Sequence, residues 1–302
     1  MRSVDTVSEF RGVFPVPLTP FREADQSVDY GKLEEHIEWL IQSGAAGLVS
    51  NGSTSEFPML CDEEARKAAE IIIDKAAGRV PVIVGATAPS TWKTVEYCKI
   101  AKDVGADGIL ALPPYYFPLT DDEVCKHFEV MAKATDLPIM VYNNPGTSKV
   151  DIKPELVARL AEIEHVDYIK ESSGQASRVH EIKALAGDKI KIFIGADNIF
   201  FDALAAGAVG VIASSGNIIV SQMSEVFRLV FEEHDLIRAR EKFDVISPVC
   251  SFVDGSCQFV QVLKTALDIM GRPVGPPRDP MLPLSGESRE RLAAVLKKAG
   301  VC

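Results

Sequence analysis

The stretch Ser43-Gly44-Ala45-Ala46-Gly47-Leu48-Val49 decides the fold, because the chain uses the same pattern three times. It returns at residues 104–110 and again at residues 206–212. Each copy follows an amphipathic helical stretch and opens a short aliphatic run. The first glycine suits a left-handed helix C-cap, and the aliphatic run suits a buried parallel strand. The copies are spaced by about two and about three βα units of roughly thirty residues each.

Further aliphatic runs complete a set of eight expected strands. They lie at residues 12–16, 47–50, 80–84, 108–112, 138–142, 166–170, 190–194 and 210–213. Helical patterns separate them, for example at residues 32–42, 63–75, 123–134 and 154–161. Eight alternating units predict an α/β chain folded as a closed (β/α)8 TIM barrel. The alternative, a doubly wound dinucleotide-binding sheet, needs a G-x-G-x-x-G turn after the first strand, which residues 14–20 do not contain.

After residue 220 the strand pattern stops and helical patterns take over. We expect three helical stretches, at about residues 221–240, 257–270 and 287–299. No low-complexity linker separates them from the barrel. We therefore predict a barrel over residues 8–235 and a C-terminal helical appendage over residues 236–302.

Composition excludes several classes of protein. The 302 residues carry a net charge of −11, with no run of basic residues longer than two, which argues against binding to nucleic acid or an anionic membrane. No apolar run is long enough to span a bilayer, and residues 1–10 lack the apolar core of a signal peptide. Six cysteines without a CxxC pair indicate free thiols in a reducing compartment, so we expect a cytoplasmic protein.

Lys170 is the most informative residue, because TIM-barrel enzymes carry their active sites at the C-terminal ends of the strands. It ends the sixth expected strand after an aliphatic run. An amine held away from water is favoured in the neutral form that attacks a carbonyl. Position alone leaves two interpretations open, a nucleophilic amine or a structural ion pair with a carboxylate of a neighbouring strand end. Alternation turns the next residue, Glu171, toward the helices, where we expect a structural role.

Two further groups lie at strand ends near this lysine. Tyr142 ends the preceding strand at the level of Lys170, where its phenol could exchange protons with a bound group. A core tyrosine with a hydrogen-bonded hydroxyl is the alternative. The turn at residues 52–55 offers hydroxyls and N–H groups for a substrate carboxylate, although such residues also cap ordinary helices.

Metal and phosphate chemistry are not expected. The five histidines lie on expected helices or before a strand, never at the C-terminal end of a strand, and no pair has ligand spacing. The loops after the seventh and eighth strands contain no glycine-rich phosphate cradle. The sequence therefore disfavours a metal-dependent aldolase and a phosphorylated substrate.

Several motifs occur in an order that resembles one known family. They lie at residues 12–21, 52–57, 114–116, 142–145, 169–171 and 207–213. With these motifs the chain resembles the dihydrodipicolinate synthase / N-acetylneuraminate lyase family over essentially its whole length. The resemblance implies a cofactor-free (β/α)8 barrel with a helical C-terminal region, and a homotetramer built as a dimer of dimers. It also implies a Schiff base between a lysine of the sixth strand and a small, pyruvate-like 2-oxo acid.

The resemblance also implies roles for individual residues. Lys170 would form the imine, and Tyr142 would donate and accept protons. Thr54 and Ser53 would bind the substrate carboxylate, and Ser53 would also relay protons. Tyr116 would complete that relay in the site of a neighbouring copy, across a dimer interface.

The remaining expected contacts concern the pocket wall and the substrate tail. The backbone at Ile212 would line the pocket. Ser55 stands where the family's turn usually has a glycine. Thr147 stands where the synthases carry an arginine that binds the second substrate's carboxylate, and Lys149 adds a cation nearby. Asn198 occupies the position of a glutamate that binds sugar hydroxyls in sialic-acid lyases.

Two enzymatic hypotheses follow. The first is a class I lyase that acts on pyruvate or on a 2-keto-3-deoxy or hydroxy-2-oxo acid by aldol cleavage, condensation or dehydration. The second is 4-hydroxy-tetrahydrodipicolinate synthase, which condenses pyruvate with aspartate semialdehyde. Thr147 favours the first, because one neutral hydroxyl does not replace the paired charge-assisted bonds of a guanidinium. A non-enzymatic relative would be expected to have lost Lys170 or Tyr142, and this chain has both.

Overall fold

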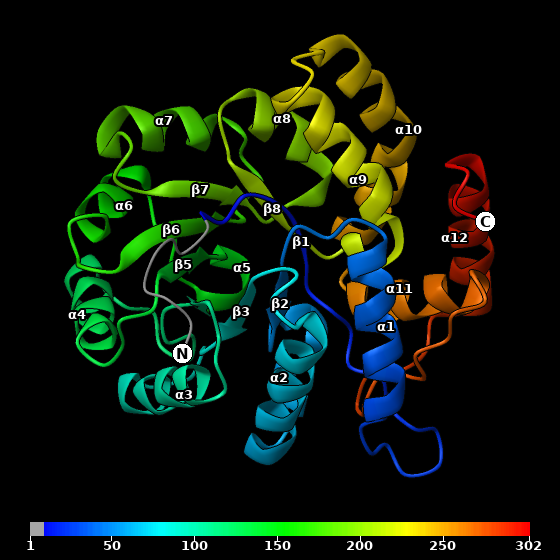
Figure 1. The fold of residues 1–302 in the computed structure, drawn as a ribbon, viewed down its shortest axis with the longest axis horizontal. Coiled ribbons are helices and arrows are strands. Elements are labelled where there is room, and N and C mark those ends of the chain that lie inside the picture. Colours follow the sequence, from blue (N-terminus) through cyan, green and yellow to red (C-terminus); the bar gives the residue numbers. More distant parts are fainter. Residues whose placement is uncertain (1–8) are drawn as a thin grey trace.

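The computed structural model describes residues 9–302, and its centre is a nearly closed barrel of eight parallel strands (Figure 1). The strands are Gly12–Pro15 (β1), Leu48–Ser50 (β2), Val82–Gly85 (β3), Gly108–Ala111 (β4), Ile139–Asn143 (β5), Val166–Glu171 (β6), Lys191–Ile194 (β7) and Gly210–Ala213 (β8). Neighbours pair in the order β1-β8-β7-β6-β5-β4-β3-β2. The predicted TIM barrel is confirmed. Residues 1–8, most of the segment inspected for a signal peptide, lie outside the described residues.

The repeated glycines end helices as the sequence predicts. Gly44, Gly105 and Gly207 have φ angles of +98°, +86° and +104°. Side chains of L-residues rarely adopt these angles, whereas glycine does so at little cost. Every residue of the strands that follow, β2, β4 and β8, is buried. The repeat is therefore the turn that sends each helix back into the barrel wall.

Helices surround the barrel on its outer side (Figure 1). They are Tyr30–Gln42 (α1), Asp62–Ala76 (α2), Thr91–Asp103 (α3), Asp121–Ala132 (α4), Pro154–Leu160 (α6), Ser177–Ala186 (α7), Phe200–Ala205 (α8) and Gly216–Phe231 (α9). A four-residue helix, Pro145–Ser148 (α5), follows β5 directly. Across the part of the chain that the structure describes, no helix is both long and apolar enough to cross a membrane.

The C-terminal region contains more helix than predicted. After α9 come Leu236–Asp254 (α10), Phe259–Ile269 (α11) and Gly286–Lys298 (α12). The expected stretch at residues 221–240 is wrong, because it merges the end of α9 with the start of α10 and omits most of α10. The proposed division between residues 235 and 236 stays a prediction.

The expectation at residues 221–240 is wrong because the chain breaks between α9 and α10 without the glycine or proline that usually ends a helix. His234 takes a φ of 55°, and the side chain of Asp235 caps α10 by accepting the N–H of Arg238 at 3.0 Å. No glycine or proline marks this turn. Pro248 lies inside α10, where a proline normally indicates a helix end.

Side chains fill the barrel interior. Phe14, Phe193 and Tyr168 meet edge to face, with ring centroids 5.3 Å apart for Phe14 and Phe193 and 6.1 Å apart for Tyr168 and Phe193. Such a filled interior leaves the two ends of the barrel for binding, and chemistry in this fold takes place at the C-terminal end of the strands.

A buried ion pair joins the C-terminal helices to the turn after β2. The ammonium of Lys264, on α11, lies 2.6 Å from Oε1 of Glu56, and both side chains are almost fully buried. Lys264 also donates to the carbonyls of Thr19 at 2.9 Å and Pro276 at 2.8 Å. The N–H of Arg278 donates to the other Glu56 oxygen at 2.9 Å. The C-terminal helices therefore hold the turn Ser53–Ser55, which immediately precedes Glu56.

We expect Lys264→Met to lower the free energy of unfolding, because it leaves the Glu56 carboxylate buried without its cation. Removing one partner of such a pair typically costs ~3–5 kcal/mol. Chemical denaturation at a fixed protein concentration measures the change. In the double variant Glu56→Gln/Lys264→Met neither charge remains, and most of the stability should return. A single variant as stable as the wild type would contradict a stabilising role for this ion pair.

Candidate active site

A cavity of about 340 Å³ opens at the C-terminal ends of the strands. Its wall contains many hydroxyl and amide groups and comes from both the barrel and the C-terminal helices. Six of the predicted site residues line it: Ser53, Thr54, Tyr142, Thr147, Lys170 and Asn198. The structure therefore brings together in one cavity residues that are far apart in the sequence.

Lys170 and Tyr142 form the centre of this site. They are paired in the register of β5 and β6, and each is only 6% exposed. The Lys170 ammonium lies 4.0 Å from the centroid of the Tyr142 ring, a cation–π arrangement. Asn144, which sequence reasoning did not single out, donates from Nδ2 to the Tyr142 hydroxyl at 2.9 Å.

The surroundings of Tyr142 favour loss of its proton. Burial acts to raise the pKa of the phenol, but the adjacent Lys170 charge outweighs it, together with hydrogen bonds from Asn144, Lys170 and Ser172. The pKa of Tyr142 is therefore lowered from its usual value. A buried phenol that exchanges its proton more readily is suited to general acid–base work.

Gly195, at the end of β7, leaves the space that the Lys170 side chain occupies. A Cβ at position 195 would lie 2.5 Å from Cε of Lys170 and would collide with Oγ of Ser172. Within residues 9–302, no carboxylate forms an ion pair with Lys170, and Glu171 pairs with Arg178 instead. The structure thus gives no support to the alternative of a structural ion pair at Lys170.

The expected carboxylate-binding turn forms a 3₁₀ helix over Ser53–Ser55. The first N–H groups of such a helix have no partner within it, so they are available to an anion. The hydroxyl of Thr54 lies 2.9 Å from that of Ser214, which fixes its position in the cavity. The left-handed φ of 57° falls on Glu56. Ser55 therefore fits where the resemblance led us to expect glycine.

Two predicted site residues lie elsewhere. Tyr116 is 67% exposed beside Phe117, and it does not line the cavity of its own chain. The Lys149 ammonium donates to the Tyr116 carbonyl at 3.3 Å, on the outer surface. Ile212 is 1% exposed and packs inside the barrel, so the lining after β8 comes from Ser214. The roles expected for Tyr116 and Ile212 stay predictions.

The outer part of the cavity contains an acid that sequence reasoning missed. Of the described lining residues, only Lys170 and Asp254 carry charge. Asp254 accepts the N–H of Asn198 at 2.9 Å. Asp254 is the last residue of α10, and because no helix was expected to extend that far, no signal in the sequence placed it in the cavity. Thr147 lines the same cavity from α5.

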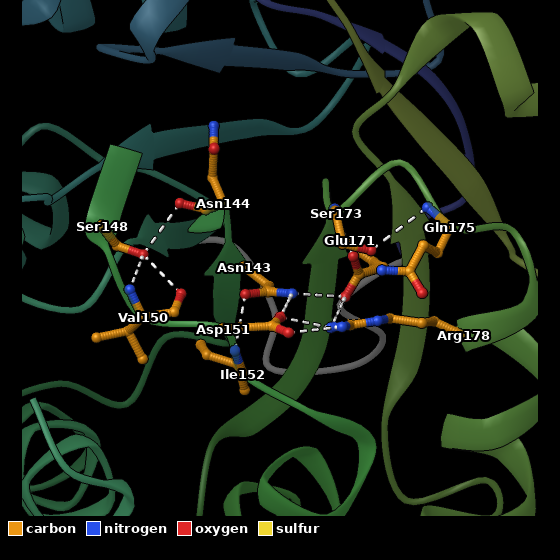
Figure 2. A network of polar contacts seen from close by, with 10 residues as sticks. All are labelled: Asn143, Asn144, Ser148, Val150, Asp151, Ile152, Glu171, Ser173, Gln175 and Arg178. Carbon is orange, nitrogen blue, oxygen red and sulfur yellow. Dashed lines mark hydrogen bonds and ion pairs between the residues drawn. The ribbon is translucent and has the colours of Figure 1, made fainter. Parts of the chain in front are cut away.

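A polar network on the helix-facing side joins β5 to β6 (Figure 2). Asn143 donates to Glu171 at 2.8 Å, and these two residues are paired in the strand register. The guanidinium of Arg178 donates to both oxygens of Asp151, at 2.5 and 2.6 Å, and lies 4.0 Å from Glu171. Ser173 donates its N–H to Glu171 at 2.6 Å. On the side of the sheet that faces away from the cavity, the network therefore holds together β5, which carries Tyr142, and β6, which carries Lys170.

Comparison with known proteins agrees with this geometry. The model of the dihydrodipicolinate synthetase family matches residues 9–299. A 4-hydroxy-tetrahydrodipicolinate synthase of Methanocaldococcus jannaschii is 36% identical over 293 residues, which covers 97% of this chain and 99% of that protein.

Solved structures give the same result. The dihydrodipicolinate synthase of Acinetobacter baumannii, solved with pyruvate, is 32% identical with a TM-score of 0.92, covering 97% of this chain and 99% of that one. A monomeric dihydrodipicolinate synthase variant is 31% identical, also with a TM-score of 0.92, covering 97% and 98%. The chain therefore belongs to the dihydrodipicolinate synthetase family and is an aldolase-type lyase.

Proposed function

We propose that the protein forms a Schiff base between Lys170 and a small 2-oxo acid, without a cofactor. The observation that carries the proposal is the buried Lys170 ammonium 4.0 Å over the ring of Tyr142, in a cavity at the barrel mouth. In this arrangement a nucleophilic amine and a group that transfers protons would both lie next to the C2 carbonyl of the substrate. The hydroxyl-rich turn at Ser53 and Thr54 lies in the same cavity and would bind the substrate carboxylate.

Imine formation and aldol cleavage need only the amine of Lys170, groups that transfer protons, and water. The Lys170 ammonium first gives up a proton, which the Tyr142 oxygen would accept. The neutral amine then adds to the C2 carbonyl, and the resulting carbinolamine loses water to give an imine. In aldol cleavage a base removes the C4 hydroxyl proton, the C3–C4 bond breaks, and its electrons move into the protonated imine to give an enamine. The aldehyde then leaves, a proton returns to C3, and water releases pyruvate. Tyr142 would carry these protons, with Ser53 as relay.

For the substrate we propose a hydroxylated 2-oxo acid, of the 2-keto-3-deoxy or hydroxy-2-oxo class. Thr147 lines the cavity, and the resemblance implies an arginine at this position in enzymes that bind a second carboxylate. Within the described lining, the one cation is Lys170, which the imine itself uses. Neutral hydroxyls of a substrate tail can pair with Thr147, Asn198 and their neighbours.

A second candidate is 4-hydroxy-tetrahydrodipicolinate synthase. The observation that favours it is the name of the methanogen relative, which matches this chain along almost its full length. The second substrate in that reaction, aspartate semialdehyde, carries a carboxylate, for which this cavity offers Thr147 in place of an arginine.

We also propose a homotetramer in which Tyr116 reaches the cavity of a neighbouring copy. The exposed aromatic side chains of Tyr116 and Phe117, whose rings contact each other, support an interface at this surface. One structural relative is a monomeric variant, so the assembly is the finer part of the proposal. A cytoplasmic location is likewise proposed, and all six cysteines carry free thiols.

Borohydride reduction in the presence of pyruvate tests the imine. We expect one covalent adduct per chain in the wild type, measured by mass, and none in Lys170→Ala. Lys149→Ala removes an exposed lysine outside the cavity and should keep the adduct. An adduct that survives in Lys170→Ala would rule out the assignment.

Tyr142→Phe keeps the ring under Lys170 and removes only the proton that the phenol exchanges. We expect kcat to fall by ~10²–10⁴, the usual contribution of general acid–base catalysis, while imine formation becomes slower. Steady-state kinetics measure the loss. Tyr97→Phe, outside the cavity, is the matched control and should behave like the wild type. Turnover of Tyr142→Phe near the wild-type level would show that another group moves the proton.

A substrate panel separates the two candidate functions. We expect cleavage or dehydration of at least one 2-keto-3-deoxy acid, and a kcat/KM for aspartate semialdehyde condensation ~10²-fold or more below it, because an unpaired buried carboxylate is costly. Thr147→Arg should raise kcat/KM for the semialdehyde by supplying a bidentate partner. Efficient condensation by the wild type, without turnover of any keto-deoxy acid, would establish the synthase instead.

A further inference from the structure

We propose that Asp254, the last residue of α10, binds the hydroxyls of the substrate tail and excludes tails that end in a carboxylate. This inference rests on the proposed function and names the group that selects the substrate. Asp254 lines the same cavity as Lys170 but comes from a C-terminal helix, whereas Lys170 comes from barrel strand β6. Within the described lining it is the one negatively charged side chain.

The position of Asp254 is held by the backbone beside the cavity. Its Oδ2 accepts the N–H of Asn198 at 2.9 Å, in the 3₁₀ turn Asp197–Ile199 that follows β7. This bond connects α10 to the barrel mouth and restricts the orientation of the carboxylate. The cavity lining also contains the neutral polar residues Thr147, Ser173, Asn198 and Ser256 and the apolar residues Val253 and Phe259.

The N–H of Asn198 gives the Asp254 carboxylate one local partner, but two other neighbours oppose a negative charge at this position. The C-terminal end of a helix carries partial negative charge, so a carboxylate there is unfavourable. A second acid, Asp197, lies close by and is fully buried. Burial, and after it the charge of Asp254, raise the pKa of Asp197 to about 7. Burial likewise raises the pKa of Asp254, whereas its backbone hydrogen bonds and the charge of Lys170 act in the opposite direction. An acid kept where burial and a second acid oppose its charge is consistent with a functional site.

The chemistry of the cavity fits a chain of hydroxyls. An ionised carboxylate is an acceptor only, and its two oxygens can accept bonds from two adjacent hydroxyls. Such bonds are charge-assisted, whereas those to Thr147 and Ser256 are neutral. A tail ending in a carboxylate would place a like charge beside Asp254. The same side chain therefore attracts one class of tail and repels the other.

Two aldehydes that differ in charge test this role in the condensation with pyruvate. Glyceraldehyde is neutral and hydroxylated, and succinate semialdehyde is anionic without an ammonium group. We expect Asp254→Asn, which keeps the shape and removes the charge, to lower the ratio of kcat/KM for glyceraldehyde over succinate semialdehyde by ~10-fold or more. Borohydride trapping with pyruvate counts the active sites of each variant.

Asp244→Asn is the matched control, because it removes one negative charge from an exposed position of the same helix, outside the cavity. It should leave the ratio unchanged. An unchanged ratio in Asp254→Asn, in a protein whose wild type cleaves hydroxylated 2-oxo acids, would overturn the role of Asp254 and leave the proposed function in place. If Asp254→Asn lowered kcat/KM for aspartate semialdehyde alone, that result would also overturn the role, because Asp254 would then pair with the ammonium of that substrate. Absence of wild-type turnover on every hydroxylated substrate would instead overturn the proposed function.

Discussion

A primary amine away from bulk water is stable only where other groups replace the contacts that water would make. For Lys170 the face of the Tyr142 ring does so at 4.0 Å, and no carboxylate of residues 9–302 forms an ion pair with it. The amine therefore stays available to a carbonyl. The other features of the site depend on this contact: Gly195 leaves room for the lysine, and the network around Glu171 holds the two strands in register.

The turn after β2, which also lines the site, is fixed by a different kind of interaction. Glu56 and Lys264 are both buried, and their ion pair joins the turn after β2 to a helix more than two hundred residues later. The carboxylate receives a second bond from the backbone of Arg278. The barrel alone thus does not define the cavity, because the C-terminal helices hold one of its turns and contribute part of its lining.

The sequence predicts what depends on local pattern, and it misses what depends on distant partners. Glycine at 44, 105 and 207 indicates the turn into a strand, because few other residues take those φ angles. Lys170 and Tyr142 follow from their places at strand ends. Asp254 was missed, since the break at His234 and the proline at 248 hide the extent of α10. Arg178 and Asp151 meet across 27 residues, a separation that leaves no local signal.

The cavity draws its wall from two stretches of chain that the evolution of the gene can change separately. The groups placed for bond making, Lys170 and Tyr142, lie on paired barrel strands, where a register shift by one residue would turn both side chains away from the cavity. The groups at the outer end, Asp254 and Ser256, lie where α10 gives way to the loop before α11, and that loop carries no strand pairing. Substitutions there can alter which aldehyde is accepted while the imine chemistry persists, so substrate range in this architecture can diverge faster than reaction type.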